Sequence, residues 1–251
     1  MTTLLVTNDD GVKAVGLLAL AQAMEQFGTV QVAAPARNQS ASGHKKTLFS
    51  NITVSDTELA NGQPATSIDG SPADCIALCA MGLRPWPPRL VVSGINRGSN
   101  MGQDITYSGT VTAALEAVIH GVPALAISLS DSNASEVADY AEAARVAAIV
   151  VRYMLNQDMP PLTILNLNIP KGKIKGIRLT RQGVRIYRDE IEMDEDRRTV
   201  RIVGEPPTGV VDELGTDIWA VHNGYASLTP IHLDMTAHRF LADLGAWDIE
   251  V

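Results

Sequence analysis

The sequence begins with a pattern that few folds accommodate: a short apolar run, an amphipathic segment and a second short apolar run. Residues 4–7 and 30–34 are largely apolar runs, as in parallel strands that are buried on both faces. Between them, apolar residues in 15–27 recur at the spacing of one helix face. A strand–helix–strand unit of this kind pairs its strands in parallel, with a right-handed crossover. The pattern therefore predicts an α/β protein.

The same alternation continues as far as residue 170. Ser71 and Pro72 are a typical N-cap and first helical residue, and the runs at 48–55 and 65–68 before them suggest a hairpin. The other elements expected here are strands at 90–93, 124–129 and 162–169 and helices at 108–120 and 135–155. Strands that alternate with helices are typical of a doubly wound, mostly parallel sheet, whose last strand would be 162–169.

The chain changes character after residue 170. The stretch 185–198 is highly charged, and a charge run is usually a solvated face, so it predicts a protruding β arm. We therefore divide the chain into an α/β core, residues 1–170, and a smaller C-terminal region, residues 171–251. The elements expected in this region are strands at 174–180, 199–203 and 225–229 and a closing helix at 235–247.

Composition and charge argue against several classes of function. The formal net charge of -8 argues against binding to duplex nucleic acid, which needs a basic surface. No apolar run approaches the ~18 residues of a membrane span, and the first residues lack the features of a signal peptide, so the expected location is the cytoplasm. Cys75 and Cys79 have no companion Cys or His at ligand spacing, which indicates buried thiols rather than a zinc or redox site.

Polar residues follow three of the expected strands, in the loops 8–11, 37–46 and 94–102. In an open α/β sheet, ligands bind beyond the carboxyl ends of the strands. These loops supply carboxylate, amide and hydroxyl oxygens, which Mg²⁺, Mn²⁺ or Ca²⁺ prefer. The adjacent carboxylates of Asp9 and Asp10 are the strongest candidates. The alternative is a simple turn, since Asn, Asp and Gly are common turn residues.

The helix expected from Ser108 offers a second kind of site. Ser108, Gly109 and Thr110 are small residues at a helix N-terminus, where unpaired N–H groups bind phosphate, although a plain N-cap is the alternative. The sequence contains no Walker A motif, no Gly-x-Gly-x-x-Gly after the first strand and no Gly-x-Ser-x-Gly. A divalent cation beside an anion-binding helix end remains, and hydrolysis of phosphate esters uses both.

Seven short motifs occur in order along nearly the whole chain, at 7–11, 34–40, 70–75, 92–102, 107–111, 215–217 and 224–230. Together they resemble the SurE survival-protein family of metal-dependent 5'/3'-nucleotidases. The resemblance implies a Rossmann-like, three-layer α/β core and a C-terminal part whose protruding hairpin and swapped segment build homodimers or homotetramers. It also implies one divalent cation, Mg²⁺ or Mn²⁺, per subunit.

The resemblance assigns roles residue by residue. The implied metal ligands are Asp9, Asp10, Ser40 and Asn96, with Ser42 as a second candidate hydroxyl. The implied phosphate pocket consists of Asn8, Asn100, Ser108, Gly109 and Thr110. The implied catalytic residues are Asp9, Asp10, Asn96 and Ser108. The expected reaction is hydrolysis of nucleoside 5'-monophosphates, with 3'-monophosphates as further substrates, to nucleoside and phosphate.

Several alternatives stay open at this point. The attacking group could be water, which we favour, or a carboxylate of Asp9 or Asp10 that forms an aspartyl-phosphate. A non-catalytic nucleotide-binding module with a structural cation is the rival outside enzymes. Haloacid-dehalogenase-like phosphatases use an Asp-x-Asp spacing, whereas the two aspartates here are contiguous. His44 and His120 have no obvious acid–base partner in the sequence.

Overall fold

The computed structural model describes residues 2–194, 196 and 198–247. Its strands are β1 Thr3–Thr7, β2 Thr29–Pro35, β3 Val54–Glu58, β4 Pro64–Ile68, β5 Leu90–Arg97, β6 Ala124–Ser130, β7 Thr163–Pro170, β8 Ile177–Leu179, β9 Arg185–Met193, β10 Val200–Gly209 and β11 Ala226–His232. Its α-helices are α1 Val15–Met24, α2 Pro72–Leu78, α3 Gly109–Ile119, α4 Ala141–Met154, α5 Asp217–His222 and α6 His238–Leu244. None of the described helices is long and apolar enough to cross a membrane.

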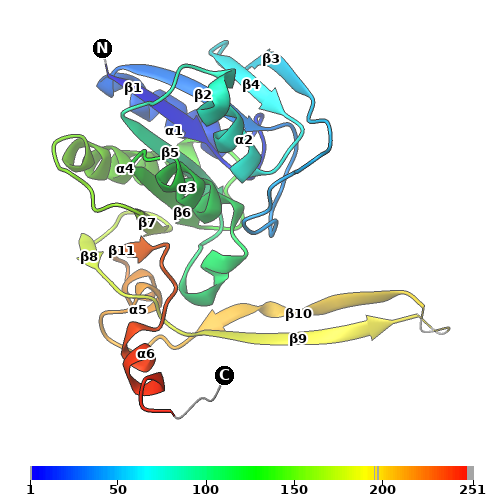
Figure 1. The fold of residues 1–251 in the computed structure, drawn as a ribbon, viewed down its shortest axis with the longest axis vertical. Coiled ribbons are helices and arrows are strands. Elements are labelled where there is room, and N and C mark those ends of the chain that lie inside the picture. The colour runs from blue at the N-terminus through cyan, green and yellow to red at the C-terminus, as the bar shows by residue number, and fades with distance from the viewer. Residues whose placement is uncertain (1, 195, 197, 248–251) are drawn as a thin grey trace.

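Three layers build the core, as expected (Figure 1). A nine-stranded, mostly parallel sheet has the order β3-β4-β2-β1-β5-β6-β7-β11-β8. Helices α1 and α4 pack on one face of the sheet, and α2 and α3 on the other. Successive side chains of a strand point to opposite faces, so Leu4 and Val6 enter the first apolar cluster and Leu5 the second. The predicted α/β fold class is confirmed.

The predicted first unit is present with its expected pairing. Strand β1 pairs in parallel with β2 on one side and with β5 on the other. Ser71 caps α2 by accepting a hydrogen bond from the Asp74 N–H at 3.0 Å, and Pro72 is the first helical residue, as predicted. Cys75 and Cys79 are buried free thiols, and burial raises the pKa of both. The predicted strand pairing, helix cap and buried thiols in this part of the chain are therefore all present in the structure.

Two strand predictions were wrong in their extent. The hairpin β3–β4 exists, but its first strand begins at Val54, because Leu48 and Phe49 are exposed and Phe49 has a φ of +61°. The strand predicted at 90–93 continues to Arg97, since Gly94 lacks a Cβ that would lie 2.4 Å from the Ile127 carbonyl oxygen on β6. The start of the predicted loop 94–102 is therefore strand.

The sheet does not end at the strand predicted for 162–169. The C-terminal strand β11 pairs antiparallel with β7, and β8 pairs in parallel with β11. An unpaired β7 edge would expose a row of backbone N–H and C=O groups, which the returning chain covers. The C-terminal region thus contributes strands to the same sheet as the core. The functional division into 1–170 and 171–251 stays a proposal.

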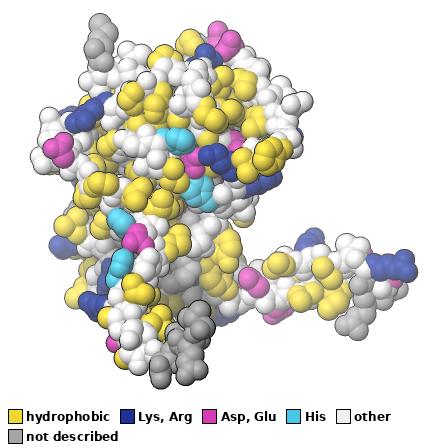
Figure 2. All heavy atoms as spheres, viewed as in Figure 1, with side chains coloured by type: hydrophobic (Ala, Val, Ile, Leu, Met, Phe, Trp, Pro, Cys, Tyr) yellow, Lys and Arg dark blue, Asp and Glu magenta, His cyan; other side chains and the backbone are white. Residues whose placement is uncertain are grey.

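The predicted arm is a separate two-stranded sheet of β9 and β10 that projects from the body (Figure 1). Strand β9 lies entirely within the charged stretch 185–198, which was expected to lie between strands; residues 195 and 197 of the stretch lie outside the described part. Both faces of the ribbon are solvated, so charges fit a strand, and Arg188 pairs with Glu205 at 3.2 Å across it. Apolar side chains, Ile191, Val200 and Ile202 among them, are also exposed along the arm (Figure 2).

Other elements differ from their predictions at the ends. The strand predicted at 174–180 shrinks to the three residues of β8, and β11 runs three residues beyond the predicted 225–229. The predicted helix 135–155 begins as a short 3₁₀ segment, Val137–Tyr140, before α4, and the closing helix is limited to α6. Helix α5 and the 3₁₀ helix η3, Gly102–Thr106, were missed because both are shorter than two helical repeats.

A buried carboxylate joins the C-terminal region to the core. Asp217, fully buried at the start of α5, accepts hydrogen bonds from the backbone N–H groups of Gly102 at 2.9 Å and of Gly183 and Ile218 at 2.8 Å. Removing the carboxylate leaves three buried donors unpaired. We expect Asp217→Ala to lower the free energy of unfolding by about 3 kcal/mol or more, measured by urea denaturation. The exposed Asp212→Ala should change it little, and equal effects of the two variants would contradict this role.

Candidate active site

The chain turns sharply at the end of β1, and this turn presents two carboxylates. Asn8 is fully buried, and its side-chain amide donates to the Gly11 carbonyl oxygen at 3.1 Å and accepts from the Gly11 N–H at 3.2 Å. Gly11 has a φ of +104°, a conformation that favours glycine. The turn suggested by the sequence is real, and Asp9 and Asp10 lie inside it. The side chain of Asn8 closes the turn and is not free to face a ligand.

Asp9 lies against the N-terminus of α3. The Thr110 hydroxyl donates to Asp9 Oδ1 at 2.5 Å. A Cβ on Gly109 would lie 2.7 Å from the Cβ of Asp9 and 2.9 Å from Cγ of Pro72, so only glycine allows this approach. Ser108 is the N-cap of α3 and accepts from the Val111 N–H at 3.1 Å. The cap and the carboxylate contact are therefore parts of one arrangement.

Asp10 connects two further loops to the turn. One of its oxygens accepts from the Arg97 N–H at 3.1 Å, and the other accepts from the Asn38 side-chain amide at 3.4 Å. Asn38 in turn accepts from the Ser40 N–H at 2.7 Å. Burial raises the pKa of the Asp10 carboxyl group, against the Arg97 hydrogen bond that lowers it. The loops after β1, β2 and β5 thus meet at the carboxyl end of the sheet, as expected for ligand binding.

A cavity of about 750 Å³ brings most of the predicted site residues together. It is lined by Asp9, Ser40, Asn96, Asn100 and Ser108. Asp10 lines a smaller neighbouring cavity of about 280 Å³, which shares Arg97 with the first. Asn8, Gly109 and Thr110 are not in the wall and lie buried behind it. The separate loops predicted to converge do converge.

The sequence did not reveal the other wall of this cavity. Tyr187 and Asp189 on β9 and Ile202 and Pro207 on β10 line it beside Tyr107. The arm is held here because the Tyr187 hydroxyl and the Arg185 guanidinium, at 2.7 and 2.5 Å, donate to Asp104 of η3. No local signal in the charged stretch indicates that it returns to the site, because the contact joins residues more than 80 positions apart.

Buried amides on β7 were also missed. The Asn100 carbonyl oxygen accepts from the side chains of Asn166 and Asn168, both at 2.9 Å, and the Asn100 N–H donates to Asn168 Oδ1 at 2.8 Å. The Asn100 side chain donates to the Ser128 hydroxyl at 2.8 Å. Two amides in an otherwise apolar strand are the signal that could have found them, since buried polar side chains need partners.

The donor set fits a hard divalent cation. Two partly or fully buried carboxylates, a hydroxyl and an amide oxygen are the ligand types of Mg²⁺ and Mn²⁺. Within the described residues, Asp9 and Asp10 form no ion pair with a basic side chain, so their adjacent charges lack a neutralising partner. In the described part of the chain, no group of three or more His, Cys, Asp or Glu side chains is placed to hold a metal ion. A cation here would need neutral oxygens besides the two carboxylates, and Ser40 and Asn96 in the wall of the cavity are the predicted ones.

The protonation of Asp9 gives a testable pH dependence. Burial raises the pKa of Asp9 to about 6 from an ordinary value of 3.8, with the Thr110 hydrogen bond opposing the rise. The unfolded chain releases this proton first, so metal-free stability falls as pH rises from about 4 to about 6. We expect the free energy of unfolding of Asp9→Asn, relative to that of wild type, to increase by about 3 kcal/mol across this window, measured by urea denaturation in chelator. If the free energies of unfolding of the two proteins changed with pH in the same way, the raised pKa of Asp9 would be contradicted.

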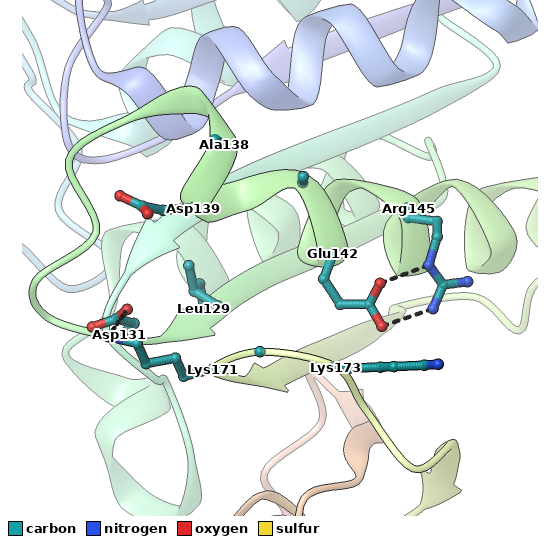
Figure 3. Close-up of a pocket in the computed structure, with 10 residues that line it drawn as sticks. Leu129, Asp131, Ala138, Asp139, Glu142, Arg145, Lys171 and Lys173 are labelled. Atoms are coloured by element: carbon teal, nitrogen blue, oxygen red, sulfur yellow. Dashed lines mark hydrogen bonds and ion pairs between the residues drawn. The ribbon is translucent and has the colours of Figure 1, made fainter.

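A second cavity, of about 790 Å³, lies beside the ends of β6 and β7 (Figure 3). Four of its six charged side chains form ion pairs. Lys171 pairs with Asp131 at 2.9 Å, and Arg145 forms two hydrogen bonds with Glu142. None of the predicted site residues lines this cavity, so the cavity at Asp9 is the better candidate.

Fold and site together define an α/β protein that collects oxygen ligands and a helix N-terminus at the carboxyl end of its sheet. Residues 4–189 match the family described as "Survival protein SurE". Relatives named 5'-nucleotidase SurE are 44% identical in Chloroflexus aggregans (98% of this chain, 99% of the relative) and 46% identical in Syntrophotalea carbinolica (98% and 97%). The crystal structure of SurE protein from Aquifex aeolicus has a TM-score of 0.81 at 38% identity and covers 96% of this chain and 98% of its own. The chain belongs to the SurE family.

Proposed function

We propose that this protein hydrolyses nucleoside 5'-monophosphates to nucleoside and phosphate with one divalent cation, Mg²⁺ or Mn²⁺, per subunit. The observation that carries the proposal is the N-terminus of α3 against Asp9, in one cavity with Ser40 and Asn96. This arrangement suits a cation next to a phosphate. The names of the relatives support the same substrate class. Activity on 3'-monophosphates is part of the proposal.

We assign the residues different roles according to where they lie in the site. Asp9, Asp10, Ser40 and Asn96 would hold the cation, which when bound neutralises phosphate charge. Asn100 and Ser108, in the cavity wall, would bind and orient phosphate oxygens, and the first turn of α3 adds its positive dipole end. Thr110 fixes the Asp9 carboxylate through its hydroxyl. Asn8 holds the turn that carries both aspartates.

Water is the attacking group we favour. The Asp9 carboxylate is buried and engaged by Thr110, and Asp10 is engaged by Arg97 and Asn38, so neither is a free nucleophile. A water oxygen bonds to phosphorus, the ester P–O bond breaks, and a proton passes to the departing nucleoside oxygen. A single turnover in ¹⁸O water should place the label in the first phosphate released. Unlabelled phosphate would exclude direct attack by water and indicate an aspartyl-phosphate that water cleaves at its carbonyl carbon.

We also propose that the protein acts as a homodimer or homotetramer in the cytoplasm. The exposed apolar side chains of the arm support association, because a two-stranded ribbon buries little of them by itself. A segment exchanged between subunits and the division of labour between 1–170 and 171–251 belong to the same proposal. The free thiols Cys75 and Cys79 fit a reducing compartment.

A metal-controlled assay tests the function. We expect phosphate release from AMP and from p-nitrophenyl phosphate with Mn²⁺ or Mg²⁺, and its loss in excess chelator with recovery on adding metal back. Phosphate release should be measured in parallel with AMP binding by calorimetry. A non-catalytic nucleotide-binding module with a structural cation would bind AMP without releasing phosphate. Turnover that persists in chelator would contradict the metal requirement.

A further inference from the structure

A buried carboxylate on α3 gathers basic side chains away from the aspartate site. The side chain of Glu116 is 4% exposed, and it accepts from Lys46 Nζ at 2.9 Å. His44 Nε2 lies 2.9 Å and His120 Nε2 3.1 Å from its two oxygens. Burial acts to raise the pKa of Glu116, but hydrogen bonds from these three side chains outweigh it and hold the pKa at about 2. These histidines therefore do have an acidic partner.

Two of these basic side chains belong to the loop that carries Ser40, residues 37–47. His44 and Lys46 reach Glu116 from this loop, whereas His120 is the C-cap residue of α3, four positions after Glu116. Glu116 is thus bound on one side to its own helix and on the other to a segment 70 residues earlier in the chain. Breaking the first contact leaves every contact of the loop in place, whereas breaking the others removes both side-chain contacts between the loop and Glu116. The loop is also held by hydrogen bonds to Thr112, Ser71 and Asp74.

Backbone contacts place the loop between the site and α3. Its beginning is held where the Gln39 N–H donates to the Asp9 carbonyl oxygen at 2.7 Å. Further on, the Gly43 carbonyl oxygen accepts from the Thr112 hydroxyl of α3 at 2.9 Å. Ser40 lies between these anchors, in the wall of the cavity. The helix that presents its N-terminus to Asp9 therefore also holds the loop that brings Ser40 to Asp9.

We propose that Glu116 is a positioning residue for the phosphatase site: through His44 and Lys46 it fixes the 37–47 loop on α3 and so sets the distance between Ser40 and the aspartates. This inference rests on the proposed function. Partners that orient metal ligands without touching the metal commonly change its affinity by about 10- to 100-fold. The residue acts on cation binding and leaves the chemical step at saturating metal unchanged.

The chain offers a matched pair of variants. His44→Asn with Lys46→Met removes both loop contacts with Glu116, and His120→Asn removes a contact with the same carboxylate from the C-cap of α3. Both histidines are partly exposed, so neither change should prevent folding. Hydrogen exchange followed by mass spectrometry reports the loop without any metal or substrate. We expect exchange in 37–47 to rise about tenfold in the double variant and to stay at the wild-type rate in His120→Asn.

Metal titration completes the test. The Mn²⁺ concentration for half-maximal AMP hydrolysis should rise about tenfold in the double variant, with kcat at saturating Mn²⁺ close to wild type. His120→Asn should match wild type in both quantities. Unchanged exchange and unchanged half-saturation in the folded double variant would overturn the inference, as would equal effects in His120→Asn. If wild type were inactive but exchange in 37–47 still rose in the double variant, the proposed function would be rejected. The role of Glu116 in holding the loop on α3 would stand.

Discussion

Asp9→Asn is expected to lower kcat/KM for AMP by at least about 10³-fold while the fold is retained. Asn keeps the shape of the side chain and can still accept from the Thr110 hydroxyl, but it removes the negative charge that would bind the cation. Loss of one charged group at a reacting centre costs about 3–4 kcal/mol of transition-state stabilisation or more. Initial rates with Mn²⁺ measure the effect, and circular dichroism checks the fold.

The matched control for this charge is Asp56→Asn on β3. Asp56 is exposed and pairs with Arg84 on the hairpin side of the sheet, so its loss should leave kcat/KM within about twofold of wild type. Comparing the same Asp→Asn substitution at the two positions thus distinguishes an effect at the site from a general effect of losing a surface charge. If Asp9→Asn kept the wild-type kcat/KM, Asp9 would have no part in the proposed chemistry, whatever the stability of the variant.

Gly109→Ala should have the second largest effect, about 10²-fold or more on kcat/KM. The new Cβ would lie 2.7 Å from the Cβ of Asp9, 2.9 Å from Pro72 Cγ and 3.0 Å from Asp9 Oδ2. Real Cβ atoms do not approach so closely, so α3 and the β1 turn must separate by several tenths of an ångström. Thr110 then loses its short hydrogen bond to Asp9, although alanine itself suits a helix better than glycine.

Gly62→Ala provides the control for this substitution. Gly62 lies in the turn between β3 and β4 with a φ of +82°, and nothing lies within 4 Å of an added Cβ. Its alanine variant should lose about 1–2 kcal/mol of stability from backbone strain and keep wild-type kcat/KM. Steady-state kinetics and urea denaturation of both variants separate the two effects. Wild-type kinetics for Gly109→Ala would show that the close packing is not needed for activity.

Local signals in the sequence account for most of the core. Apolar runs of strand length located β1, β2 and β6, and the apolar spacing of 15–27 located α1. Ser71 and Pro72 marked the start of α2, because capping depends on residues adjacent in the chain. The sequence also indicated that polar loops would share one edge of the sheet, since parallel strands bring their carboxyl ends together.

Long-range contacts account for what the sequence missed. Strands β11 and β8 join the main sheet because β7 has an open edge, which no local pattern records. The arm was expected, but its return to the cavity depends on Asp104 meeting Arg185 and Tyr187. The same holds for the side chains of β7 that hold Asn100, whose partners lie 66 and 68 positions away.

The turn at Asn8–Gly11 shows where the two kinds of information divide. Sequence by itself determined that a strand ends there in two carboxylates and a glycine, because residue type and order decide a turn. Only the tertiary structure decided that Asp9 is buried against Gly109 and Thr110 and that Ser40 lies in the same cavity. The physical reason is that burial and hydrogen bonding depend on which distant segments pack together, and that choice is made by the whole core.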